Sequence, residues 1–331
     1  MVRFQARIAI LHWRDILNPE SGGAENLLFR IAQELASRGL QVTWFSPKFR
    51  GSRIVDRVRG VVIHRFGGRY NAYLLACLFY LIRWRKHFDL FVDSITGVPW
   101  LTPLYARQAR LAVIYHLGRK ETFLRDLHRL GVRGYVFAVL AMIAESSIPF
   151  LYRNTDVLTF SQDTRNELLK SGLHPRRVFV AQEGIELERY TPNFGKPSRP
   201  TIVYVGRLVA TKGIKHLLHA TKKIKQRIPN VRLIVMGRGY LERELRELCV
   251  YLGLDGNVEF TGYVSDEQKT AILRGAHVLV MPSLREGWAT SVLEANACGT
   301  PAVGTDVPGV RGTIVDGVTG FLGSEIPTGC Q

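Results

Sequence analysis

Short apolar runs recur along the whole chain with helical patterns between them, and this alternation limits the fold more than any other feature. In the first half the runs are Ile8–Leu11, Val42–Phe45, Val61–Ile63, Leu90–Val92, Leu111–Tyr115, Val157–Phe160 and Val178–Val180. In the second half they are Thr201–Val205, Val231–Met236, Val258–Phe260, His277–Met281 and Val303–Asp306. Continuous apolar runs of this length are typical of strands buried in a parallel sheet. The alternation therefore predicts an α/β protein with doubly wound sheets.

The length of the chain and one irregular segment predict two domains. At 331 residues and 46% hydrophobic, the chain can form two sizeable cores. The segment Tyr190–Pro200 holds Pro192, Pro197, Pro200 and Gly195 and has no apolar period, as is typical of a linker. We place the boundary near residue 190, which gives domains 1–190 and 191–331.

Two glutamates flank a turn in the second half. Pro282 ends the strand His277–Met281, Gly287 opens a turn, and Thr290 begins a helix. Glu286 precedes this helix, and Glu294, eight residues or about two turns of helical spacing later, lies inside it. Either glutamate alone would be interpreted as a solvated side chain. Because one helix end cannot satisfy both carboxylates, we expect that at least one of them faces a polar ligand.

Two cations follow the strand Thr201–Val205 in the spacing GR-x4-KG. Arg207 lies in a loop bounded by glycines, and Lys212 comes immediately before the helix Ile214–Arg227. Each cation alone would be an ordinary surface charge. Together at one strand–loop–helix junction they predict a pocket for a diphosphate.

Two features of the first half also lie at the carboxyl ends of predicted strands. Gly22 and Gly23 precede an amphipathic helix, and because glycine has no side chain, the backbone there can approach a ligand closely. His116 follows the strand Arg110–Tyr115. A single histidine there is more often structural than catalytic, and a pair of glycines is more often only a turn. Open α/β sheets nevertheless bind ligands at this edge.

The string EGWATSVLEANACGTPAVG, the GR-x4-KG spacing and the GGAE loop at Gly22 together resemble glycosyltransferase family 4. The resemblance covers nearly the whole chain and is densest over 201–322. It implies the GT-B fold, in which two Rossmann-like domains face a central cleft, and a retaining transfer from a nucleotide-diphosphate sugar. In the family the first glutamate, here Glu286, meets the transferred sugar, and the second, here Glu294, binds the ribose hydroxyls.

The resemblance carries the family's roles onto individual positions. The catalytic set is His116, Arg207, Lys212 and Glu286. The donor-binding set is Gly22, Gly23, Gly237, Tyr263, Val264, Gly287, Trp288, Ala289, Thr290, Ser291 and Glu294. The acceptor is expected to be a hydroxyl on a saccharide or a lipid-linked molecule.

No metal or cofactor is expected. The chain contains no D-x-D, and its His, Cys and Asp residues show no metal-ligand spacing. Arg207, Lys212 and the helix N-terminus at Thr290 would then neutralise the departing diphosphate.

Several positions depart from the family pattern. Ala289 stands where a glycine is usual, and Leu117 follows His116 where an acidic residue is usual. The chain ends at Gln331, whereas relatives continue through further helices, so we expect the second domain to be incomplete at its C-terminus. These departures support an alternative, a nucleotide-sugar-binding protein with impaired catalysis. A sugar-nucleotide epimerase and a dinucleotide dehydrogenase fit the glycine and glutamate pattern less well.

The charge balance is strongly basic, with 45 Lys and Arg against 28 Asp and Glu. Nucleic acid is not expected as a partner, because the chain has no nucleic-acid-binding signature. Two apolar segments, Tyr73–Trp84 and Tyr135–Ala144, are too short to span a bilayer and lie beside basic residues. The flanking cations are Arg83, Arg85, Lys86 and His87 for the first, and Arg125, Arg129 and Arg133 for the second. Such stripes suit either an anionic membrane surface or the protein core.

The cysteines predict the compartment. There are four, far apart, without a C-x-x-C pair, as is usual for reduced thiols. No signal peptide precedes the first strand. We therefore expect a cytoplasmic protein, peripheral on the inner face of the membrane.

Overall fold

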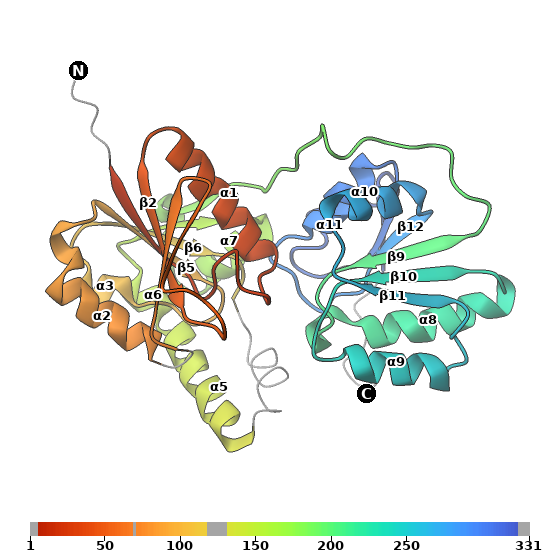
Figure 1. Ribbon diagram of the computed structural model, residues 1–331, viewed down its shortest axis with the longest axis horizontal. Coiled ribbons are helices and arrows are strands. Elements are labelled where there is room, and N and C mark those ends of the chain that lie inside the picture. The colour runs from red at the N-terminus through yellow and green to blue at the C-terminus, as the bar shows by residue number, and fades with distance from the viewer. Residues whose placement is uncertain (1–5, 69–70, 118–130, 324–331) are drawn as a thin grey trace. The chain divides into compact units, whose positions relative to one another are not determined.

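The computed structural model describes residues 6–68, 71–117 and 131–323, and the chain forms two compact units, Met1–Gln182 and Glu183–Gln331. Each unit is built on its own sheet with helices packed against it (Figure 1). The division falls a few residues before the linker expected from the prolines.

The first unit contains an eight-stranded sheet in the order β3-β4-β2-β1-β5-β6-β7-β8. All of its strand pairs are parallel except β3–β4. The strands are β1 (Arg7–Leu11), β2 (Gln41–Pro47), β3 (Val55–Val58), β4 (Val61–Phe66), β5 (Leu90–Ile95), β6 (Ala109–Ile114), β7 (Asp156–Thr159) and β8 (Val178–Val180). The helices are α1 (Gly23–Ser37), α2 (Ala72–Ile82), α3 (Thr102–Tyr105), α5 (Gly131–Ser146), α6 (Ile148–Leu151) and α7 (Gln162–Lys170), with short 3-10 turns at Trp84–Lys86 and Pro175–Arg177.

The second unit contains a six-stranded, fully parallel sheet in the order β11-β10-β9-β12-β13-β14. The strands are β9 (Thr201–Val205), β10 (Arg232–Met236), β11 (Val258–Gly262), β12 (Val278–Met281), β13 (Ala302–Thr305) and β14 (Gly320–Gly323). The helices are α8 (Ile214–Arg227), α9 (Glu242–Tyr251), α10 (Asp266–Gly275) and α11 (Thr290–Ala297), with a 3-10 turn at Ala210–Lys212.

Local sequence explains the helices of the second unit. In α8 the buried residues Ile214, Leu217, Leu218 and Thr221 recur at i, i+3, i+4 and i+7, which is one helical face. Ser265 begins α10 with a capping box, because its hydroxyl accepts from the Gln268 amide while the Gln268 side chain accepts from the Ser265 amide. These signals are local, so the sequence predicts these helices well.

The predicted α/β architecture is confirmed, and the apolar runs mark every strand except β3 and β14. β3 is a short edge strand, and it is only partly buried. Its two half-buried positions are Asp56 and Val58, so no run or alternation of apolar residues marks this strand in the sequence.

The proline-rich segment after Tyr190 packs on the second unit. It has no regular structure, but Lys196 donates to Thr300 at 2.8 Å, and Arg274 donates to the Thr191 carbonyl at 2.9 Å. Tyr190 itself is buried in the core of that unit.

Candidate active site

Two loops at the carboxyl ends of β9 and β12 are held together by their backbones. The Leu284 amide donates to the Thr211 carbonyl at 2.9 Å. Gly213 has φ +66°, and a β-carbon there would lie 2.0 Å from the Pro282 carbonyl oxygen. Only glycine allows this approach. The contact brings the GR-x4-KG loop against the loop that carries Glu286.

Lys212 and Glu286 form an ion pair across these loops. The Lys212 ammonium lies 2.5 Å from Oε1 of Glu286, and the Ser283 hydroxyl donates to the same oxygen at 2.7 Å. Both charged side chains are mostly buried, with 14% and 13% exposed. A charge-assisted bond in this setting is stronger than a surface pair, so it fixes both groups.

Glu294 is bound in the same manner by different residues. Oε1 of Glu294 accepts from the Tyr190 hydroxyl at 2.7 Å and from the Lys269 ammonium at 2.8 Å. Burial alone would lower the pKa of Lys269, but the charge of Glu294 and its hydrogen bond raise that pKa above the usual value. Burial, and then the charge of Glu294, raise the pKa of Tyr190 to about 12. Lys269 is therefore charged and Tyr190 neutral at physiological pH.

The two glutamates share one pattern. Each uses Oε1 for a lysine and a hydroxyl, and neither Oε2 accepts a hydrogen bond from any residue that the structure describes. A carboxylate oxygen can accept two O–H donors. Both acids therefore offer one oxygen to a polyhydroxyl ligand while the other oxygen anchors the side chain.

A third acid lies at the start of α11. The Thr290 hydroxyl donates to Oε2 of Glu183 at 2.6 Å, and the indole of Trp288 donates to the Glu183 carbonyl at 3.3 Å. From the sequence we expected this helix N-terminus to bind the diphosphate. The structure places a carboxylate of the chain itself on the Thr290 hydroxyl.

The remaining predicted donor-binding residues are found in several settings. Gly237 has φ +133°, and a β-carbon there would lie 2.0 Å from the Gly206 carbonyl oxygen, so this glycine is required by packing of the loops. Tyr263 is 77% exposed beside the partly buried Val264. Ala289 is buried in the core, so its methyl group packs inward. Gly287, Trp288 and Ser291 are partly exposed in the same loop and helix.

Arg207 is not joined to the Lys212–Glu286 pair in this structure. It lies in the loop after β9, is exposed, and its side chain makes no hydrogen bond or ion pair with another described residue. The sequence placed it with Lys212 by spacing alone. Spacing fixes the loop but not the direction of a long side chain.

The first unit gathers the remaining predicted residues at the carboxyl ends of its strands. Gly22 and Gly23 open α1, where Glu25 accepts from the Gly22 amide at 2.8 Å. A β-carbon at Gly23 would meet nothing within 4 Å. The Tyr115 hydroxyl donates to the Ala24 carbonyl at 3.2 Å, so the end of β6, where the half-buried His116 follows, lies near this loop.

Comparisons with known proteins identify the family of this chain. The model for Glycosyltransferase Family 4 matches residues 21–189, and the model for Glycosyl transferases group 1 matches residues 188–325. The chain is 31% identical over 328 residues to the phosphatidylinositol N-acetylglucosaminyltransferase gpi3 subunit of Schizosaccharomyces pombe, covering 94% of this chain and 69% of that protein. It is 31% identical to the D-inositol 3-phosphate glycosyltransferase of Corynebacterium efficiens, over 92% of this chain and 78% of that protein. The sucrose-phosphate synthase of Thermosynechococcus elongatus has the same fold, with a TM-score of 0.77 at 19% identity, over 97% of this chain and 86% of that one.

The chain belongs to glycosyltransferase family 4.

This glycosyltransferase has the GT-B fold and transfers a sugar from a nucleotide-sugar. The alternative of a binding protein without catalysis is not favoured, because the relatives are named as transferases. Within the described ranges no helix has the length and hydropathy needed to cross a membrane.

Four residues that hold this site were not predicted from the sequence. Lys269 and Tyr190 anchor Glu294, Ser283 donates to Glu286, and Glu183 binds Thr290. Tyr190 was assigned to the start of a linker, and Lys269 was given no role. Tyr190, an aromatic residue at the start of the proline-rich segment, is a signal that could have indicated a contact with the second domain.

Proposed function

We propose that this glycosyltransferase moves its sugar with retention at the anomeric carbon, without a metal ion, to a hydroxyl of a saccharide or lipid-linked acceptor. The observation that carries the proposal is the pair of anchored glutamates, Glu286 and Glu294, each with Oε1 bound by a lysine. Nucleotide-sugars present hydroxyls on both the sugar and the ribose. Two fixed carboxylates suit these two hydroxyl sets.

The donor is held at three points. Glu294 accepts the ribose hydroxyls through Oε2, and Glu286 accepts hydroxyls of the transferred sugar. Lys212 has three N–H donors, of which Glu286 occupies one. Its remaining donors face the diphosphate.

Charge neutralisation replaces a metal in this proposal. The bond from the anomeric carbon to the diphosphate oxygen breaks, and the bond to the acceptor oxygen forms on the same face. Lys212, together with Arg207 once its exposed side chain turns toward the donor, stabilises the charge that develops on the departing diphosphate. A phosphate oxygen of that leaving group takes the proton of the acceptor hydroxyl.

The first unit carries the remaining predicted residues. Gly22 and Gly23 let a ligand approach the start of α1 closely, although the Gly22 amide is bound by Glu25. A β-carbon at Gly23 would meet no neighbouring atom, so packing does not explain the glycine there. His116 orients a hydroxyl of the transferred sugar.

The acceptor class follows from the names of the relatives. One acts on phosphatidylinositol and the other on D-inositol 3-phosphate, by their names. Acceptors that carry inositol, either free or on a lipid, are therefore the first to test.

We also propose that the first unit rests on an anionic membrane surface. α2 buries Ala72, Ala76 and Tyr80 and exposes an apolar face on its other side. This face is Leu74, Leu78, Leu81 and Ile82, and the exposed Arg83, Arg85 and Lys86 follow it. α5, which extends away from the sheet in Figure 1, exposes Tyr135, Val136, Leu140 and Ile143. Apolar side chains beside cations suit the boundary of an anionic bilayer.

Part of that prediction falls on residues that are not described. Arg125 and Arg129 lie outside the described residues, as does the side chain of Arg133. Location in the cytoplasm, the absence of a metal and the absence of a nucleic-acid partner stay predictions.

The deciding experiment is a thermal-shift screen with UDP-, GDP- and ADP-sugars, followed by transfer assays with the best donor. A ligand that binds only the folded form raises the melting temperature. Lys212→Ala should lower turnover by about two orders of magnitude or more without unfolding the protein, although it leaves Glu286 without its charged partner. Lys215→Ala is the matched control, because Lys215 lies on the same helix in an exposed pair with Glu244. Turnover that Lys212→Ala leaves intact, or that EDTA abolishes, contradicts the mechanism, and inversion seen by NMR contradicts retention.

A further inference from the structure

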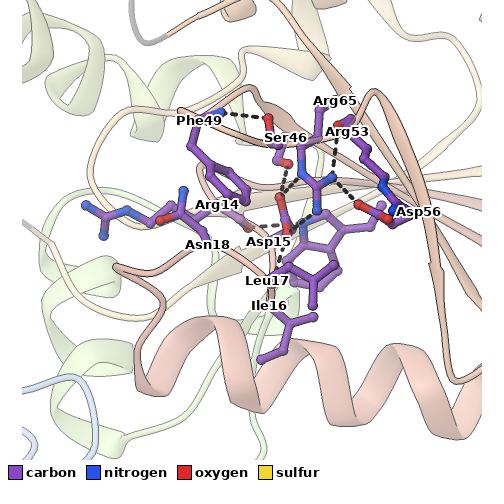
Figure 2. A network of polar contacts seen from close by, with 12 residues as sticks. Arg14, Asp15, Ile16, Leu17, Asn18, Ser46, Phe49, Arg53, Asp56 and Arg65 are labelled. Carbon is purple, nitrogen blue, oxygen red and sulfur yellow. Dashed lines mark hydrogen bonds and ion pairs between the residues drawn. The ribbon is translucent and has the colours of Figure 1, made fainter. Parts of the chain in front are cut away.

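A buried arginine of the first unit, Arg65, binds the loop between β1 and α1. Arg65 lies on β4, and its side chain is fully buried. Its Nε donates to Oδ2 of Asp15 at 2.7 Å, and its Nη2 donates to Oδ1 at 2.7 Å (Figure 2). This bidentate geometry fixes both the distance and the orientation of the carboxylate.

The third nitrogen of the same guanidinium binds the neighbouring loop. Nη1 donates to the Arg53 carbonyl at 3.0 Å and to Asp56 at 2.5 Å (Figure 2). The ring of Phe49 packs on the guanidinium at 5.0 Å. Arg65 therefore joins the β2–β3 loop to the β1–α1 loop.

The Asp15 carboxylate accepts two further hydrogen bonds, one from β2 and one from its own loop. Its carboxylate accepts from the Ser46 hydroxyl at 2.8 Å and from the Leu17 amide at 3.0 Å. The rest of the loop is braced by the Arg14–Glu20 pair at 2.6 Å. The carboxylate thus has four donors and no contact with solvent.

The location of the network decides what it can do. Asp15 follows the carboxyl end of β1, and Arg65 is the last residue but one of β4. The loop that they fix ends at Gly22 and Gly23. A buried ion pair contributes little net stability compared with apolar residues of the same size, so its bidentate geometry is better explained by a role in fixing one conformation.

We propose that Arg65 is a positioning residue: by binding Asp15 it fixes the β1–α1 loop, and so holds the Gly22–Gly23 backbone in the conformation that meets substrate. The second part rests on the proposed function. The first part does not, because it concerns only the conformation of the loop.

The test compares two variants that alter the same guanidinium network on different sides. Arg65→Lys keeps the charge but cannot bind Asp15 through two nitrogens. Asp56→Asn weakens the partner on β3 and leaves the Asp15 side intact. Amide hydrogen exchange of the segment 12–22 is measured in both, with kcat and KM of transfer.

We expect exchange in 12–22 to rise about tenfold or more in Arg65→Lys and to stay as in the natural protein in Asp56→Asn. kcat/KM should fall about tenfold or more only in Arg65→Lys. If Arg65→Lys does not fold, the double variant Arg65→Gln/Asp15→Asn removes both charges together and is measured in its place.

Each outcome bears on the proposal. Unchanged exchange in 12–22 overturns loop fixing, and increased exchange with unchanged kcat/KM overturns the link to substrate. Exchange that rises equally in every strand shows a merely structural role and also overturns it. If the natural protein transfers no sugar, the proposed function fails, but the exchange measurement still decides whether Arg65 fixes the loop.

Discussion

The Lys269 ammonium, on α10, lies 2.8 Å from Oε1 of Glu294, and the same oxygen accepts a hydrogen bond from the Tyr190 hydroxyl. This is the same arrangement as Lys212 with Glu286 and Ser283. A lysine that binds one oxygen of a glutamate fixes the orientation of the carboxylate. The other oxygen is then presented to the donor without a loss of side-chain freedom on binding.

Lys269→Met should weaken binding of the nucleotide-sugar about tenfold, because Glu294 would lose its charged partner while mostly buried. Isothermal titration with the donor found in the screen measures this effect. Lys215→Met is the matched control, since its pair with Glu244 is about half exposed on both sides and contributes little. Equal affinities for Lys269→Met and the natural protein would show that Glu294 needs no anchor.

Gly213→Ala should destabilise the second unit by about 3 kcal/mol or more, because its β-carbon would collide with the Pro282 carbonyl oxygen. Gly253→Ala is the matched control. It has nearly the same backbone angle, φ +68° against +66°, but open space around the added carbon. We expect it to cost about 1 kcal/mol. Urea denaturation measures both, and a similar loss in the two variants would disprove the steric argument.

His12 should make the first unit less stable in mild acid. It is fully buried and stacked on Trp44, and burial lowers its pKa to about 4 from the usual 6.5. Between these values the unfolded chain binds the proton and the folded chain does not. Stability therefore falls as the pH is lowered from about 6.5 to 4, by about 3 kcal/mol in all.

Calorimetry from pH 7 to 4 on the natural protein and on His12→Phe isolates this effect. Burial raises the pKa of Asp93, which gives a slope of the opposite sign, but it does so in both proteins. The difference between the two curves should therefore shrink or reverse as the pH falls. Parallel curves would mean that His12 does not resist protonation.

Replacing the apolar face of α2 should release the protein from anionic vesicles. Leu78→Ser/Leu81→Ser/Ile82→Ser removes exposed apolar surface without changing the buried Ala76 and Tyr80. Vesicle flotation should show about tenfold less bound protein than for the natural sequence. Val250→Ser/Tyr251→Ser, on the exposed face of α9, is the control and should bind normally. Equal binding by both variants, or none by the natural protein, argues against this surface.

The sequence by itself determined the two α/β units, the strands that end at the candidate site and the loops that carry Lys212, Glu286, Gly22 and His116. These features are local. A buried strand shows a continuous apolar run, a helix shows a period near 3.6, and a glycine marks a position such as Gly213 where no side chain fits. Strand β3 was missed because an exposed edge strand shows no such period.

The tertiary structure alone decided which side chains anchor the site. Tyr190 and Glu294 are 104 residues apart, and Asp15 and Arg65 are 50 apart. Their contacts depend on strand order and on how helices pack, and no local pattern records either. Side-chain direction is equally non-local: Lys212 turns to Glu286 whereas Arg207, five residues earlier, extends to solvent. Which side chains distant in the sequence come into contact depends on tertiary packing, which forms only when the chain folds.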